Sequence, residues 1–133
     1  MTGRWTVIAL AFAGLAAPAL AETTTQPTIQ AWCTGGIAGI YQYVSVTPDG
    51  EIRAVNRPVD GPWPVVGNDL AAAARWFAAL ALQGPADPVA EDDDAPVVMD
   101  AIHCGLSVSG DGKVVPYDHP DVHHKIMAWV PGR

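Results

Sequence analysis

Two histidines near the C-terminus have the spacing of a metal site. His119 and His123 lie four positions apart in "HPDVHHK", so a helix over this stretch would place both imidazoles on one side. Imidazole nitrogens bind zinc and copper, and Asp118 or Asp121 could add a carboxylate oxygen. The spacing fixes no third ligand. The sequence therefore leaves two interpretations open: a metal site, or solvated histidines on a helix surface.

Cys33 and Cys104 are the only cysteines of the chain, and they lie far apart in sequence. Both follow an N-terminal stretch that is typical of exported proteins, which fold where thiols are oxidised. We therefore predict a disulfide between them, with two buried free thiols or metal ligands as the alternative. A bridge across so long a loop would add roughly 4 kcal/mol to stability by lowering the entropy of the unfolded chain.

Familiar catalytic signatures are missing from the sequence. It has no nucleophile elbow, HExxH pair, phosphate loop or dinucleotide fingerprint. The acidic run "EDDD", Glu91–Asp94, lacks the spaced ligands and the glycine of a calcium loop, and it predicts a solvated acidic loop. We therefore predict a protein that is not an enzyme and that needs no cofactor.

Trp63 is the best candidate for an exposed interface residue. It stands between Pro62 and Pro64, which would hold it on a stiff loop. Tryptophans on rigid loops anchor many interfaces, and the alternative for Trp63 is packing in the core.

The N-terminal stretch has the pattern of a secretory signal peptide. Arg4 precedes a short apolar run, and residues 19–21 read Ala-Leu-Ala, a small-x-small cleavage site. We predict a signal peptide over 1–21, a flexible segment over 22–27 and one domain over 28–133. The protein is then periplasmic or secreted, and the chain without its leader is not expected to insert into a membrane.

The charge of the chain excludes two common classes of partner. The sequence has 14 Asp and Glu against 7 Lys and Arg, and its formal net charge is −7 at pH 7. Nucleic acids and anionic membranes attract basic surfaces. We therefore expect neither nucleic acid nor an anionic membrane as a partner.

Alternating apolar residues predict a hairpin at the start of the domain. The stretches "TIQAWC" at 28–33 and "IYQYVSV" at 40–46 both alternate, and "TGGIAG" at 34–39 separates them. Its glycines permit positive φ or a close approach of the backbone. The sequence "TPDGE" then predicts a turn into a short strand at "IRAV".

The middle of the chain predicts a loop followed by a helix. "NRPVDGPWPVVG" contains three prolines and predicts an extended surface loop. "NDLAAAARWFAALALQGP" predicts a helix that Asn68 caps and that Gly84-Pro85 ends. Its expected buried stripe consists of Leu70, Ala73, Ala74, Phe77 and Leu80.

The last third of the chain predicts a second hairpin and a second helix. Asp111-Gly112 is a tight-turn signal, and Cys104 lies on the apolar face of the first arm, as Cys33 does in its own strand. Pro120 suits the first turn of the final helix, with Asp118 or His119 as cap. The order β-β-α-β-β-α predicts an α+β fold: a small antiparallel sheet of about four strands, two helices packed on one face, and one disulfide.

The glycine turn and the order of elements resemble one protein family. The stretch "TGGIAGIYQYVSV", the alanine-rich helix, "HCGLSVSGDGKVVPYD" and the final "IMAWV" are similar to the emfourin-type protealysin inhibitors. These are small bacterial proteins with a Gly-Gly-x-Ala-Gly turn between their first strands. Gly35, Gly36, Ala38 and Gly39 match this turn, and Thr34 stands where the family usually has a small hydroxyl residue.

The resemblance implies an inhibitor of thermolysin-like zinc metallopeptidases that blocks the active-site cleft, with the zinc belonging to the peptidase. It implies a secreted or periplasmic peptidase as the partner, and it makes the turn residues that match the motif candidate binding residues. Two alternatives stay open: a periplasmic metal-binding protein that uses His119 and His123, and a structural module of the cell envelope.

Overall fold

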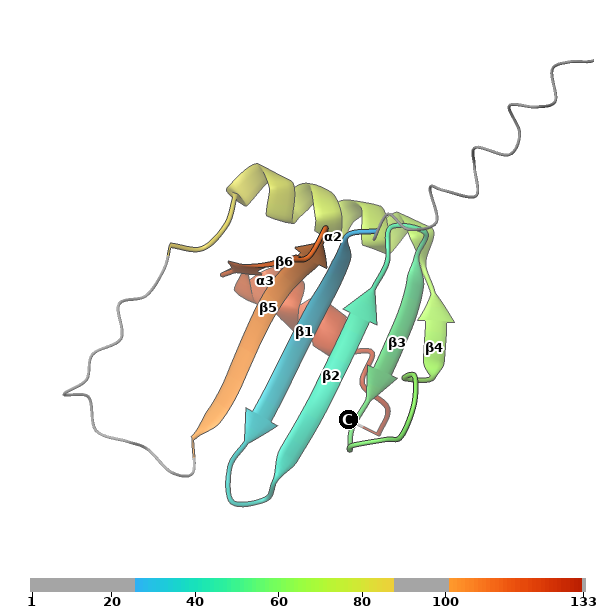
Figure 1. The fold of residues 1–133 in the computed structure, drawn as a ribbon, viewed down its shortest axis with the longest axis vertical. Coiled ribbons are helices and arrows are strands. Elements are labelled where there is room, and N and C mark those ends of the chain that lie inside the picture. The colour runs from blue at the N-terminus through green and yellow to red at the C-terminus, as the bar shows by residue number, and fades with distance from the viewer. Residues whose placement is uncertain (1–25, 88–100, 133) are drawn as a thin grey trace, which may run out of the picture.

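A six-stranded antiparallel sheet and two helices make up the fold in the computed structural model, which describes residues 26–87 and 101–132 (Figure 1). The predicted signal peptide and the acidic run Glu91–Asp94 lie outside these residues. The elements are β1 (Thr28–Gly35), β2 (Ile40–Val46), β3 (Glu51–Val55), β4 (Val65–Asn68), α2 (Leu70–Gln83), β5 (Ile102–Gly110), β6 (Lys113–Tyr117) and α3 (Pro120–Met127). Neither helix of this described part is long and apolar enough to cross a membrane.

The strand order in the sheet is β4-β3-β2-β1-β5-β6, and every neighbouring pair is antiparallel. Because β1 lies between β2 and β5, its residues have partners on both sides. Ile29, Ala31 and Cys33 of β1 point to one face of the sheet and are buried there. The α+β fold with an antiparallel sheet, predicted from the alternation of apolar residues, is confirmed.

The prediction of about four strands was wrong, because β3 and β4 extend the sheet beyond β2. Residues 51–55 form β3, the short strand expected after the turn at Gly50. The proline-rich stretch was expected to be a loop throughout, but its last residues form β4. This strand begins directly after Pro64 and pairs only with β3. An edge strand of four residues needs few ladder hydrogen bonds, so nearby prolines do not prevent it.

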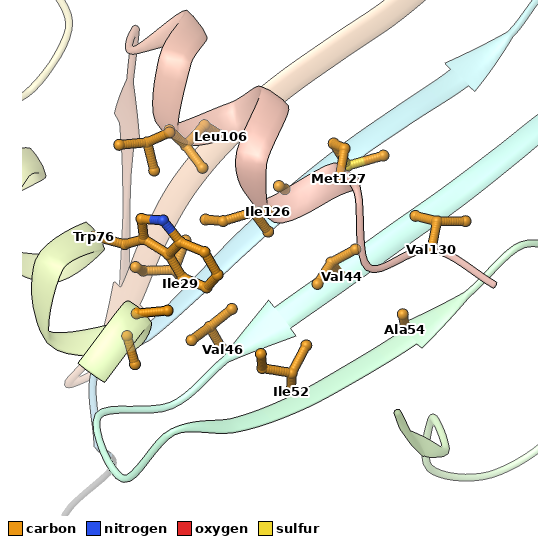
Figure 2. Close-up of a cluster of buried hydrophobic side chains, with 14 of the residues drawn as sticks. Ile29, Val44, Val46, Ile52, Ala54, Trp76, Leu106, Ile126, Met127 and Val130 are labelled. Carbon is orange, nitrogen blue, oxygen red and sulfur yellow. The ribbon is translucent and has the colours of Figure 1, made fainter. Parts of the chain in front are cut away.

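The core lies between one face of the sheet and both helices. Figure 2 shows Trp76 of α2 among Ile29 and Val46 of the sheet and Ile126 of α3. The buried side chains of the helices are Ala72, Ala73, Trp76 and Leu80 of α2 and Val122, Ile126 and Met127 of α3. Burial of this apolar surface is the main stabilising contribution to so small a domain.

The predicted buried stripe of α2 was wrong in part. Ala73 and Leu80 are buried as expected, but Leu70 is 60% exposed and Ala74 is also exposed. Trp76, which is not part of the expected stripe, is buried. Burying the large indole stabilises more than burying Leu70, so the helix is rotated toward Trp76.

The N-cap of α2 is Asp69, whereas Asn68 was predicted. The Asp69 carboxylate accepts a hydrogen bond from the backbone N–H of Ala72 at 2.9 Å. Asn68 is the last residue of β4 and pairs with Glu51 of β3. Both side chains could cap a helix, and the register of β3 with β4 decides between them.

Replacement of Asp69 by alanine is expected to lower the free energy of unfolding by about 1 kcal/mol, because the N–H of Ala72 loses its acceptor. Urea unfolding followed by circular dichroism measures the loss. Asp60→Ala, an exposed carboxylate in the loop before β4, is the matched control and should change stability by less than about 0.5 kcal/mol. Equal losses in the two variants would contradict the capping role.

The β2–β3 turn is held by local hydrogen bonds. The Gly50 N–H donates to the carbonyl oxygen of Thr47 at 2.9 Å. The Thr47 hydroxyl donates to the Asp49 carboxylate, and this bond, followed by one from the Glu51 N–H, holds the pKa of Asp49 below its ordinary value. A lowered pKa means that this stabilisation is present above the ordinary pKa and is lost as the pH falls through the lowered one.

The second hairpin and the last helix form as the sequence predicts. Asp111 and Gly112 take positive φ, 52° and 76°, in the turn between β5 and β6. His119 is the N-cap of α3, since its Nδ1 accepts from the Val122 N–H at 3.3 Å, and Pro120 is the first residue of the helix.

Candidate functional site

The glycine turn joins β1 to β2 at the end of the sheet opposite α2 (Figure 1). Its backbone is closed by a hydrogen bond from the Gly39 N–H to the carbonyl oxygen of Gly36 at 3.1 Å. Gly35, Gly36 and Gly39 have φ of 103°, 79° and 67°. Only glycine adopts such values without strain, so the backbone of this turn depends on the glycines of the motif.

The base of the turn is fixed on both sides. Thr34 stands opposite Tyr41 of β2 and opposite His103 of β5. Gly35 lies very close to the backbone of Ala101, the residue before β5. A Cβ at position 35 would lie 2.7 Å from the carbonyl oxygen of Ala101. The flanking ladders therefore end at Gly35, and the residues up to Gly39 extend beyond the sheet.

Ile37, at the tip of this turn, is the candidate residue that sequence reasoning missed. Its side chain is 91% exposed, and Ala38 and Gly39 beside it are exposed as well. Ile37 occupies the variable position x of the Gly-Gly-x-Ala-Gly motif, so the resemblance gave no reason to select it. The available signal was an apolar β-branched residue in a turn, where polar residues and glycine are the rule.

The predicted disulfide is confirmed. Cys33 of β1 and Cys104 of β5 stand directly opposite each other, and their sulfurs are bonded. Because Cys33 lies two residues before Gly35, the bridge ties the base of the turn to β5. The two sides of the bridge differ in access: Cys33 is 7% exposed, whereas Cys104 is exposed to solvent.

His123 of α3 lies over this disulfide and is half-buried. Its Nε2 is 3.1 Å from the carbonyl oxygen of Trp32 and 3.9 Å from the Sγ of Cys33. His123 and His119 both line an open cleft of about 230 Å³, and Cys104 lines this cleft as well. The predicted pair of histidines therefore borders one cleft, with one ring nitrogen of each already in a hydrogen bond.

One group of three potential metal ligands occurs among the residues that the structure describes. It consists of Cys33, Cys104 and His123, whose ligand atoms lie within 4.8 Å of one another, and His119 is not a member. Both sulfurs of this group are bonded to each other. The group therefore offers thiolate ligands only after the disulfide has been reduced.

Trp63 lies on the face of the sheet that the helices leave uncovered. Its ring contacts that of Tyr43 with centroids 5.4 Å apart, and Tyr43 contacts Tyr41 at 4.8 Å. Its carbonyl oxygen accepts from Arg53 at 2.8 Å. Trp63 is half-buried in this row of aromatic rings, so it is neither a core residue nor a freely exposed anchor.

Comparisons of the chain with models of protein families, with curated proteins and with solved structures find no match. By its own fold and site, the protein is a small α+β domain in which a disulfide and two neighbouring strands hold an exposed glycine turn.

Proposed function

We propose that this is an exported, non-catalytic binding protein that inhibits a thermolysin-like zinc metallopeptidase. The observation that carries the proposal is the turn between β1 and β2, whose tip presents Ile37 with 91% of its side chain exposed. Its sequence, Thr34 to Gly39, is the stretch that resembles the emfourin-type inhibitors.

The shape of the turn suits a cleft. A peptidase binds its substrate in a groove, and a narrow turn at the end of a sheet can enter a groove that a flat face cannot. Gly36 and Gly39 carry no side chain, so the backbone of a partner can approach them closely. Ile37 then supplies the apolar side chain that fills a pocket, as anchor residues do at other interfaces.

The support beneath the turn lowers the cost of binding. A flexible loop loses conformational freedom when it is held in a cleft, and that loss weakens affinity. Here the ladders to β2 and β5 reach Gly35, and the Cys33–Cys104 bridge lies two residues before it. The turn is therefore ordered before it meets its partner.

Two further features support export. The N-terminal residues have the pattern of a signal peptide, and a disulfide persists in the oxidising compartments outside the cytosol. The proposed peptidase is accordingly periplasmic or secreted, where the two proteins would meet.

The direct test is inhibition of a purified thermolysin-like metallopeptidase by the purified protein, measured with a fluorogenic peptide. We expect inhibition at nanomolar to low micromolar concentration, and weaker inhibition after reduction of the disulfide. No inhibition at high micromolar concentration would remove the proposal.

Ile37→Asp is expected to weaken this inhibition at least about 30-fold, which corresponds to an interface residue worth about 2 kcal/mol. A carboxylate at the tip cannot fill an apolar pocket without losing its hydration. The folded domain should be as stable as before, because the Ile37 side chain is 91% exposed. Inhibition constants and urea midpoints measured side by side separate the two effects.

Leu82→Asp is the matched control for this variant. Leu82 is an aliphatic residue that is 90% exposed, but it lies near the end of α2 and far from the turn in the fold (Figure 1). It should leave inhibition unchanged. If Ile37→Asp and Leu82→Asp inhibit equally well, the turn is not the inhibitory element.

A further inference from the structure

The two cysteines of the disulfide differ in their exposure to solvent. Cys33 belongs to a strand inside the sheet and is 7% exposed. Cys104 is exposed and faces an open cleft of about 230 Å³, whose walls include Tyr117, His119 and His123. A thiolate breaks a disulfide by attacking one sulfur in line with the bond, so it must be able to reach that sulfur. Access therefore selects Cys104 as the point of attack.

His123 lies beside the other sulfur and carries a hydrogen there. Its Nε2 is 3.1 Å from the carbonyl oxygen of Trp32, and a carbonyl oxygen can only accept. Nε2 must therefore be the protonated nitrogen of the ring. The same N–H lies 3.9 Å from the Sγ of Cys33. It can stabilise negative charge on that sulfur.

These two asymmetries point to the same direction of reaction. An exchange is fast when the attacked sulfur is open and when the departing sulfur is stabilised as a thiolate. Cys104 meets the first condition, and Cys33 beside His123 meets the second. The reverse direction would require attack on the sulfur of Cys33, a residue that is only 7% exposed.

We propose that Cys104 is a thiol-reactive site at which a small external thiol forms a mixed disulfide. The thiol gives its proton to solvent and attacks as a thiolate. A bond forms between its sulfur and the Sγ of Cys104, the Cys33–Cys104 bond breaks, and the electron pair of that bond stays on Cys33. The Cys33 thiolate then accepts a hydrogen bond from His123. One disulfide replaces another, so no further oxidant or reductant is needed.

This site does not depend on the proposed inhibition, since neither the turn nor a peptidase takes part in it. The cleft beside Cys104 is small and open, which suits a low-molecular-weight thiol. A mixed disulfide at Cys104 would also free Cys33, the residue directly before Thr34. The state of this site therefore determines whether the base of the turn is linked covalently to β5.

The first experiment locates the adduct in the unaltered protein. The oxidised protein is exposed briefly to 2-mercaptoethanol, quenched with acid, alkylated and analysed by peptide mass spectrometry. We expect the hydroxyethyl adduct on Cys104 and the alkyl group on Cys33, with at least about tenfold preference over the reverse. Adduct mainly on Cys33, or equal amounts on both, would overturn the proposal.

The same experiment tests for opening by unfolding. In an unfolded chain both sulfurs are exposed, so attack there would give similar amounts of the two adducts, whereas attack on the folded protein favours Cys104 and has a rate proportional to thiol concentration. A rate that is independent of thiol concentration would mean that the bridge reacts only after the chain has unfolded, and the proposal would fail.

A second experiment tests the part of His123. His123→Phe keeps a flat ring over the disulfide but offers no N–H to the Cys33 sulfur. We expect its exchange rate to fall about tenfold. Loss of the hydrogen bond to Trp32 can only destabilise the fold and so raise the rate, and urea unfolding of the oxidised variant measures that effect separately. His124→Ala, an exposed histidine one position further along α3, should leave the rate unchanged. An unaltered rate in His123→Phe would remove His123 from the site.

Discussion

Removal of the bridge by the double substitution Cys33→Ala and Cys104→Ala is expected to lower the free energy of unfolding by about 4 kcal/mol. The two residues are 71 positions apart, so the bridge greatly restricts the unfolded chain. It restricts the folded state little, because β1 and β5 already pair on both sides of it. Domains of this size are stable by only about 5 to 15 kcal/mol, so the change is a large part of the total. Urea midpoints of the two proteins measure it.

The oxidised and the reduced protein provide the matched comparison for this prediction. Reduction breaks the bond without removing either sulfur, so a similar loss of stability in the reduced protein would assign the effect to the bond itself. A loss only in the double variant would assign it to the packing of Cys33, which is 7% exposed. If all three forms unfold at one midpoint, the bridge does not stabilise the fold.

The elements that the sequence predicted well are those with local signals. The alternation in residues 28–33 and 40–46 predicted β1 and β2, and the Asp111-Gly112 pair predicted the turn between β5 and β6. Pro120 and His119 predicted the start of α3. In each case the backbone preference of a few neighbouring residues agrees with the tertiary structure.

The elements that were predicted poorly depend on distant contacts. The choice of Asp69 over Asn68 as N-cap follows from the pairing of Asn68 with Glu51. The strand β4 exists because β3 offers it an unpaired edge. Neither fact is visible in the residues of the segment itself, since both arise from the register of strands that are brought together by the fold.

The candidate sites also differ in whether a local signal could predict them. The glycines of the turn could be recognised from a short motif, and the positive φ of Gly35, Gly36 and Gly39 explains why the backbone needs them. The position of His123 over Cys33 could not be predicted, because it depends on how α3 lies across the sheet. Sequence spacing suggested His119 as its partner, whereas in the fold its nearest chemical neighbours are the sulfur of Cys33 and the carbonyl of Trp32.

The β2–β3 turn and the start of α2 are in such close contact that only glycine fits at position 50. Gly50 has φ of 90°, and a Cβ there would lie 2.6 Å from the backbone nitrogen of Leu70 and 2.9 Å from the carbonyl carbon of Asp69. Its carbonyl oxygen also accepts from the Asp69 N–H at 2.9 Å. Turn and helix therefore cannot move apart without losing a hydrogen bond next to the residue that caps α2.

Gly50→Ala is accordingly expected to lower the free energy of unfolding by about 3 kcal/mol or more, from strained φ together with overlap of backbone atoms. Gly112→Ala separates these two causes. Gly112 has φ of 76° but open space around the position of a Cβ, so only the conformational strain of about 1 to 2 kcal/mol applies. Urea unfolding of both variants measures the difference. Equal losses would mean that the contact between Gly50 and Leu70 adds nothing, and that α2 can move away from the turn at little cost.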